Sequence, residues 1–111
     1  MIVAEISRGA IVVIGEAVKS VRRLGVVVQA DIFGGLLSVL VCPLTTEDVD
    51  APLLRIRLDP SDQLPLQSVS WIMVEHLTAI PRNTIGAVIG HITTEQQRSL
   101  DRAIIVVAGI A

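Results

Sequence analysis

The chain has 111 residues, of which 51% are hydrophobic, a formal net charge of −2 and a single cysteine, Cys42. This length predicts one domain over residues 1–111, and a lone cysteine excludes an internal disulfide and any metal site built from several cysteines. The net charge argues against binding nucleic acid by bulk attraction, and one Trp, one Phe and no Tyr argue against a general single-strand binder.

The mean hydropathy of +0.68 is high for so small a domain, so we expect a partner or a second copy of the chain to cover part of the apolar surface. The longest uncharged run, 32–46, is broken by glycines and a proline and is shorter than the ~18 residues of a membrane helix. The N-terminal residues do not have the pattern of an export signal. We therefore expect a cytoplasmic protein without a membrane segment.

Most predicted elements are β-strands. Apolar runs predict strands at 10–14, 24–30, 37–43 and 85–92, with a polar loop at 15–20. Alternation at 54–58 predicts a half-buried strand whose outer face carries Arg55 and Arg57, and a further strand is expected at 70–74. Gly86 and Gly90 predict bulges or close backbone contacts in the strand that contains them.

The C-terminal segment has a different pattern, which predicts a helix. Thr93 followed by Gln96 resembles a capping box. Apolar residues then recur at helical spacing before Gly109, at Leu100, Ala103, Ile104, Val107 and Ala108. Strands separated by short turns and followed by one helix predict a mainly β fold, a compact antiparallel barrel with the C-terminal helix packed on it.

Polar residues stand at the ends of two neighbouring predicted strands. Arg22 and Arg23 precede one strand, and Thr45 and Thr46 follow the next. If these ends meet at one rim of the sheet, guanidinium groups and hydroxyls suit a phosphodiester. The same residues also fit solvated loop charges and a turn, so this pattern alone leaves both interpretations open.

Several motifs in order resemble the MazF/PemK family of toxin ribonucleases. They are Ser7-Arg8-Gly9, the arginine before Gly25 to Gln29, Cys42 to Thr46, Ser70 to Val74, Ile80-Pro81-Arg82 and Ile85-Gly86. The resemblance implies an SH3-like barrel of the CcdB/PemK type that forms a homodimer, binds an acidic antitoxin and cuts single-stranded RNA. It implies no metal and no other cofactor, and His76 and His91 indeed lack metal-ligand spacing.

The resemblance also implies roles for individual residues. Arg23 and Thr45 take the catalytic positions, and Glu75 and His76 take the positions of a pair that helps to hold RNA. Lys19, Arg22 and Thr46 lie beside the catalytic pair and complete the predicted RNA-binding set. RNA supplies its own nucleophile, so this site would leave a 2′,3′-cyclic phosphate. His76 could transfer a proton, although a lone histidine after an apolar strand also fits a structural role.

Some residues depart from the family pattern. Leu24 replaces the proline of an Arg-Pro pair, Ala10 replaces an acidic residue, and the 15–20 loop is poor in glycine. These departures leave open a weakened member that acts as an antitoxin-binding module. The second hypothesis, ahead of this one, is a CcdB-like gyrase poison, because the CcdB toxins resemble this chain in part at residues 28–32, at Ser70-Trp71 with Met73, and at Pro81 with Ile85-Gly86. The C-terminal Ala108-Gly109-Ile110 has no tryptophan where that family has its gyrase contact, which counts against it.

Overall fold

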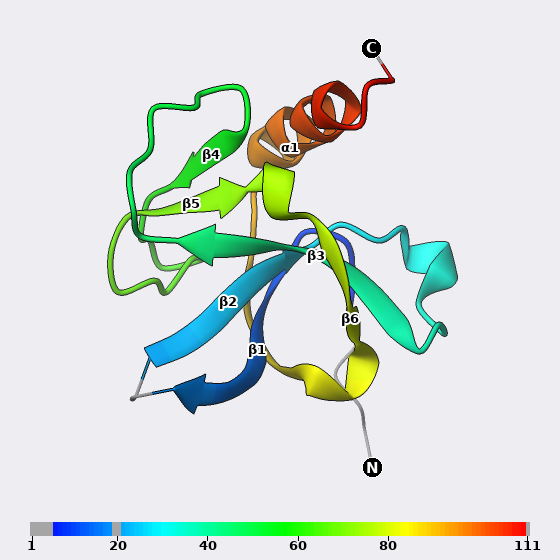
Figure 1. Ribbon diagram of the computed structural model, residues 1–111. Helices are drawn as coiled ribbons and strands as arrows, with labels where there is room; N and C mark the ends of the chain where they lie inside the picture. Colours follow the sequence, from blue (N-terminus) through cyan, green and yellow to red (C-terminus); the bar gives the residue numbers. More distant parts are fainter. Residues whose placement is uncertain (1–5, 19–20, 111) are drawn as a thin grey trace.

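A computed structural model describes residues 6–18 and 21–110 (Figure 1). The described residues form seven strands and one α-helix, joined in part by short 3-10 turns η1 (Asp31–Phe33), η2 (Val74–His76) and η3 (Arg82–Thr84). The strands are β1 (Ala10–Val18), β2 (Val21–Val27), β3 (Ser38–Thr45), β4 (Arg55–Leu58), β5 (Ser70–Met73), β6 (Thr78–Pro81) and β7 (Ile85–His91). The helix α1 (Thr94–Val107) comes last and lies beside β4 and β5 in Figure 1.

The strands form one antiparallel sheet with the order β4-β5-β3-β2-β1-β7, and β6 pairs with β3 outside this path. One edge of β3 therefore serves two partners: β6 pairs along residues 38–41, and β5 pairs at Leu44 and Thr45. The chain can make both pairings because the turn η2 bends it between β5 and β6. Between the two pairings, the ladders on this edge skip Cys42 and Pro43.

The structure confirms the antiparallel strands and the single C-terminal helix predicted from the sequence, but the barrel is not closed. β4 and β7 end the path without pairing with each other. Two expectations about single elements were also wrong. β6 was not predicted, and the segment expected as a polar loop at 15–20 begins instead as a continuation of β1 to Val18.

The extension of β1 depends on an irregularity at Gly15. The register of β1 with β2 shifts between Ile14 and Val18, and Gly15 has a φ of +64°, which favours glycine. Val18 then pairs with Val21, so β1 and β2 form a hairpin. At its C-terminal end, β2 stops at Val27 rather than at residue 30, the end of the predicted strand.

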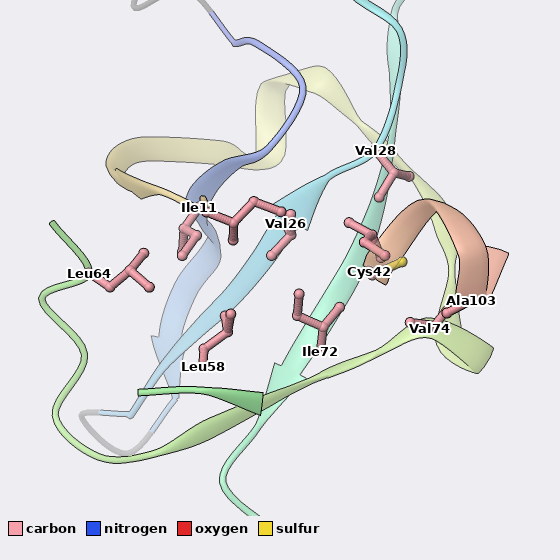
Figure 2. Close-up of a cluster of buried hydrophobic side chains, with 11 residues drawn as sticks. Ile11, Val26, Val28, Cys42, Leu58, Leu64, Ile72, Val74 and Ala103 are labelled. Carbon is pink, nitrogen blue, oxygen red and sulfur yellow. The ribbon is translucent and has the colours of Figure 1, made fainter. Parts of the chain in front are cut away.

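The sheet buries apolar side chains on both faces. On one face, β1, β2 and β3 pack against β4, β5 and α1, as Figure 2 shows for Ile11, Val26, Cys42, Leu58, Ile72 and Ala103. On the other face, the curled sheet encloses a second cluster made of Ala10, Val12, Val27, Val39 and Val41. Because successive residues of a strand point to opposite faces, these clusters determine the direction of the remaining side chains.

The helix begins at the predicted capping box. The Thr93 hydroxyl accepts a bond from the Gln96 backbone N–H, and the Gln96 side chain accepts one from the Thr93 N–H. Leu100 and Ala103 are its buried residues. Arg8 fastens the helix to the sheet, because its guanidinium donates to Asp101 Oδ1 at 2.7 Å and to the Val28 carbonyl at 3.1 Å.

Asp101 is a partly buried carboxylate on this helix. Burial alone would raise its pKa, but bonds donated by Arg8 and Gln97, together with the positive charge of Arg8, lower the pKa below its usual value.

Gly90 shows one of the predicted close backbone contacts, since a Cβ there would lie 2.7 Å from the Gln63 carbonyl oxygen. Among the described residues, no helix is long and apolar enough to cross a membrane.

Candidate functional site

Arg23 and Thr45 share a face of the sheet. Gly25 pairs with Pro43 on the β2–β3 ladder, and the same register carried two residues further places Arg23 opposite Thr45. Their neighbours Leu24 and Leu44 pack against the cluster that lies under β4, β5 and α1. Strand alternation therefore turns the arginine and the threonine away from that cluster.

These two residues line a groove of about 630 Å³ on the open part of that face. The polar side chains of the groove are Arg22, Arg23, Thr45, Thr46, Ser70, His76 and Thr78. The apolar residues that line it are Ile14, Leu24, Val41, Pro43, Leu44, Met73 and Ile80, of which Leu24 and Leu44 direct their side chains to the first cluster. The groove thus extends from the start of β2, across the end of β3, to the turn η2 and the strand β6.

Among the described residues, the hydrogen bonds of the groove occupy the Ser70 hydroxyl, which donates to the Ser68 carbonyl at 3.1 Å, but leave the donors of Thr45, Arg22 and Arg23 available. Thr45 Oγ1 accepts a bond from the Glu47 backbone N–H at 3.1 Å, which orients the hydroxyl oxygen while its own hydrogen remains free to donate. Arg22 and Arg23 are exposed, and none of the ion pairs between described residues involves either of them. Two guanidinium groups and a hydroxyl can therefore meet an anionic ligand here.

Five of the seven predicted site residues line this groove, namely Arg22, Arg23, Thr45, Thr46 and His76. Glu75 lies elsewhere, because Arg55 Nε donates to both of its carboxylate oxygens at 2.8 and 3.2 Å. Lys19, the remaining residue, falls outside the described residues.

The groove also contains residues that the sequence reasoning did not select. Ser70 and Met73 lie on β5, and Thr78 begins β6. Met73 could have been found from alternation along β5, since Ile72 is buried and its neighbour must point to the other face. Thr78 could not, because the strand that carries it was not predicted.

Two kinds of chemistry receive no support from the described residues. The Cys42 thiol is buried in the core, and burial, with a smaller contribution from the charge of Glu75, raises its pKa to about 12. It is therefore a packed apolar side chain rather than a nucleophile, as its position in an apolar strand predicted. Within 6–18 and 21–110, no group of three or more His, Cys, Asp or Glu could hold a metal ion.

Comparison with known proteins decides the family. The model of the PemK-like, MazF-like toxins of type II toxin–antitoxin systems matches residues 7–108. The chain belongs to this family. A MazF-family relative, named "Probable endoribonuclease MazF", from Mycolicibacterium smegmatis, is 40% identical over 85 residues, which are 77% of this chain and 78% of the relative.

Solved structures of MazF proteins have the same fold. The Mycobacterium tuberculosis toxin MazF-mt6 matches with a TM-score of 0.77 and 20% identity, over 90% of this chain and 96% of that one. An endoribonuclease in complex with its cognate antitoxin, from a mycobacterial species, matches with a TM-score of 0.76 and 17% identity, over 95% and 96% of the two chains. The MazF/PemK resemblance seen in the motifs is thus confirmed, and the gyrase-poison hypothesis is not favoured.

The Arg55–Glu75 and Arg57–Asp59 ion pairs differ in burial, so removing the charge of each carboxylate should change the stability of the protein by different amounts. The side chains of Arg55 and Glu75 are only 12% and 24% exposed, whereas those of Arg57 and Asp59 are 61% and 66% exposed. Glu75→Gln should lower the free energy of unfolding by about 1–3 kcal/mol, because a partly buried guanidinium loses its charged acceptor. Asp59→Asn, the matched control, should change it by no more than about 0.5 kcal/mol. Urea denaturation measures both, and equal effects would contradict this account.

Proposed function

We propose that this chain is a toxin endoribonuclease that cleaves single-stranded RNA in the groove, with the scissile phosphate between Arg23 and Thr45. The observation that carries the proposal is the convergence of these two side chains at the adjacent ends of β2 and β3. The name of the M. smegmatis relative supports the same activity. We propose RNA contacts for Arg22, Thr46 and His76 along the groove, and for Lys19 beside it.

The proposed reaction uses the 2′-hydroxyl of the RNA as nucleophile. A bond forms between this oxygen and phosphorus while the bond from phosphorus to the 5′-oxygen breaks. The 2′-hydroxyl gives up its proton and the departing 5′-oxygen takes one. The products are a 2′,3′-cyclic phosphate and a 5′-hydroxyl end.

Arg23 and Thr45 stabilise the charge that builds on the non-bridging phosphate oxygens during this step. A guanidinium offers two donors in the geometry of a phosphate, and the free hydrogen of Thr45 offers a third. His76 lines the same groove, and histidine is the residue that most often transfers protons in enzymes. Glu75 supports RNA binding indirectly, because its pair with Arg55 holds the turn η2 on which His76 lies.

Two of the departures from the family pattern, Ala10 and Leu24, are accommodated by the packing of the fold. Ala10 is fully buried in the second apolar cluster, where a carboxylate would be costly. Leu24 packs against the first cluster and pairs with Val13 on the β1–β2 ladder. We therefore favour an active toxin over a weakened antitoxin-binding module.

We also propose two protein partners. An acidic antitoxin would meet the exposed arginines of the groove. A related endoribonuclease was solved in complex with its cognate antitoxin, which supports an antitoxin partner. A second copy of the chain would cover exposed apolar side chains, of which Ile32 is 85% and Leu37 86% exposed. A toxin that cleaves messenger RNA meets its substrate in the cytoplasm.

Substitutions in the groove should separate catalysis from folding. Arg23→Ala should lower the cleavage rate by a factor of about 100 or more, because a charge-stabilising donor is lost, with little change in melting temperature. Thr45→Ala should act in the same way, less severely, whereas Thr45→Ser keeps the hydroxyl and should retain most of the activity. Arg102→Ala, an exposed arginine of α1, is the control and should cleave like the parent protein. Parent-like rates for Arg23→Ala and Thr45→Ala would place the site elsewhere.

The proposed chemistry predicts the ends of the cleaved RNA. Cleavage should continue in excess chelator and leave a 2′,3′-cyclic phosphate and a 5′-hydroxyl, because the nucleophile belongs to the substrate. A single 2′-deoxy nucleotide at the cut position should abolish cleavage there. End mapping of a long RNA treated with the purified protein provides the measurement. Cleavage that requires a divalent ion and leaves ends with a 5′-phosphate would contradict the mechanism.

The proposed homodimer predicts a mass twice the 11.9 kDa of the chain. Light scattering at micromolar concentration and moderate salt should show this mass, because association removes the exposed apolar side chains from water. A mass of one chain under these conditions would contradict the homodimer.

A further inference from the structure

A row of four side chains crosses the sheet at one level. Thr45 pairs with Trp71 on the β3–β5 ladder, and Trp71 pairs with Arg57 on the β4–β5 ladder. The β2–β3 register adds Arg23 on the other side of Thr45. In Figure 1 the start of β2, the end of β3, the start of β5 and the end of β4 all lie at the left.

The four side chains share a face of the sheet. Directly paired residues on adjacent strands point to the same side. The neighbours of Trp71 and Arg57 confirm the direction, since Ile72 and Leu58 are buried in the cluster of Figure 2. With strands ~4.8 Å apart, Trp71 lies one strand beyond Thr45 and Arg57 lies two strands beyond it, or about 10 Å.

Trp71 also lines a second hollow, of about 480 Å³, next to the groove. The other lining residues are Asp48, Val49, Asp50, Ala51, Pro52 and Arg55. Trp71 is half-buried and is the only tryptophan of the chain. An indole in an open hollow offers a flat apolar surface on which a ligand ring can stack.

We propose that this hollow is a subsite for one unpaired base of the RNA, stacked on Trp71 beside the scissile phosphate, with Arg57 contacting the phosphate that follows it. This inference rests on the proposed function. Stacking on an aromatic side chain is a common way to hold single-stranded nucleic acid. Along the row, Arg23 and Thr45 would therefore hold one phosphate, Trp71 the base and Arg57 the next phosphate.

Charge assigns the base, rather than a phosphate, to the hollow. Asp48 and Asp50 repel a phosphate there, and the charge of Arg55 is already neutralised by Glu75. Carboxylates do accept hydrogen bonds from the amino groups of bases. Arg57 is available for a phosphate because its pair with Asp59 is exposed and such pairs contribute little.

The fluorescence of the single tryptophan tests the subsite directly. The probe is a single-stranded RNA that covers the mapped cut site and carries a 2′-deoxy nucleotide there, so that it binds without being cleaved. Titration of the parent protein should quench the fluorescence with the same midpoint as binding measured by anisotropy of a labelled copy. Bound RNA without any change in Trp71 fluorescence would overturn the inference.

Variants then test the energetic contribution. Trp71→Ala should weaken binding of this RNA by about 5- to 100-fold, while Trp71→Phe should retain most of the affinity because the ring can still stack. Phe33→Ala removes an exposed aromatic ring from η1, which lies at the opposite side of Figure 1 from the row, and is the matched control. Arg57→Ala should weaken binding and reduce its dependence on salt.

The outcomes separate this inference from the proposed function. If the parent protein cleaves RNA and Trp71→Ala binds it as tightly as the parent, the base subsite is wrong and the ribonuclease remains. If RNA is neither bound nor cleaved, both proposals fall. Fluorescence quenched by an acidic peptide but not by the RNA would likewise overturn the subsite and assign the hollow to the antitoxin.

Discussion

The pairing of β3 with three other strands constrains the rest of this structure. β2 occupies one edge of β3, and the other edge is divided between β6 and β5. A strand with three partners and buried residues on both faces has no freedom to slip, because a shift of one residue would take Val39 and Val41 out of one cluster and Cys42 out of the other. The register of β3 in turn determines that Thr45 lies between Arg23 and Trp71.

The two apolar clusters explain why an open groove remains on this sheet. One cluster contains Val26 and Cys42 and packs against Leu24 and Leu44 on one face of β2 and β3, whereas the second covers only the part of the opposite face that β1, β6 and β7 enclose. The end of that face, where the chain bends at η2, remains open. Polar residues there do not displace side chains of either apolar cluster, so the ends of β2 and β3 can carry arginines and threonines.

Local charge matters more than net charge for the proposed ligand. The chain is slightly acidic overall, yet the groove presents Arg22 and Arg23 and is lined by no carboxylate among the described residues. Of the carboxylates near it, Glu75 is engaged by Arg55, and Asp48 and Asp50 line the neighbouring hollow rather than the groove. A small patch of this kind can bind a few phosphates without attracting nucleic acid to the whole surface.

Strand patterns predicted the antiparallel fold, and the capping box at Thr93 predicted the start of the helix. Strand ends also brought Arg23 and Thr45 to attention, because polar residues after apolar runs are visible in a sequence. The division of one edge of β3 between two strands was not visible, because it depends on the bend at η2 and on long-range pairing of the short β6. Glu75 could not be separated from His76 by sequence, since only the structure shows that Arg55 engages the carboxylate.

The proposed RNA lies across β2, β3 and β5 on the open face of the sheet. A crystal structure of the protein with a 2′-deoxy-substituted oligonucleotide bound at its cut site would test this placement most directly. We expect a phosphate within hydrogen-bonding distance of both the Arg23 guanidinium and Thr45 Oγ1, with the neighbouring base in the hollow beside Trp71. An oligonucleotide bound to another surface, with the groove empty, would contradict it.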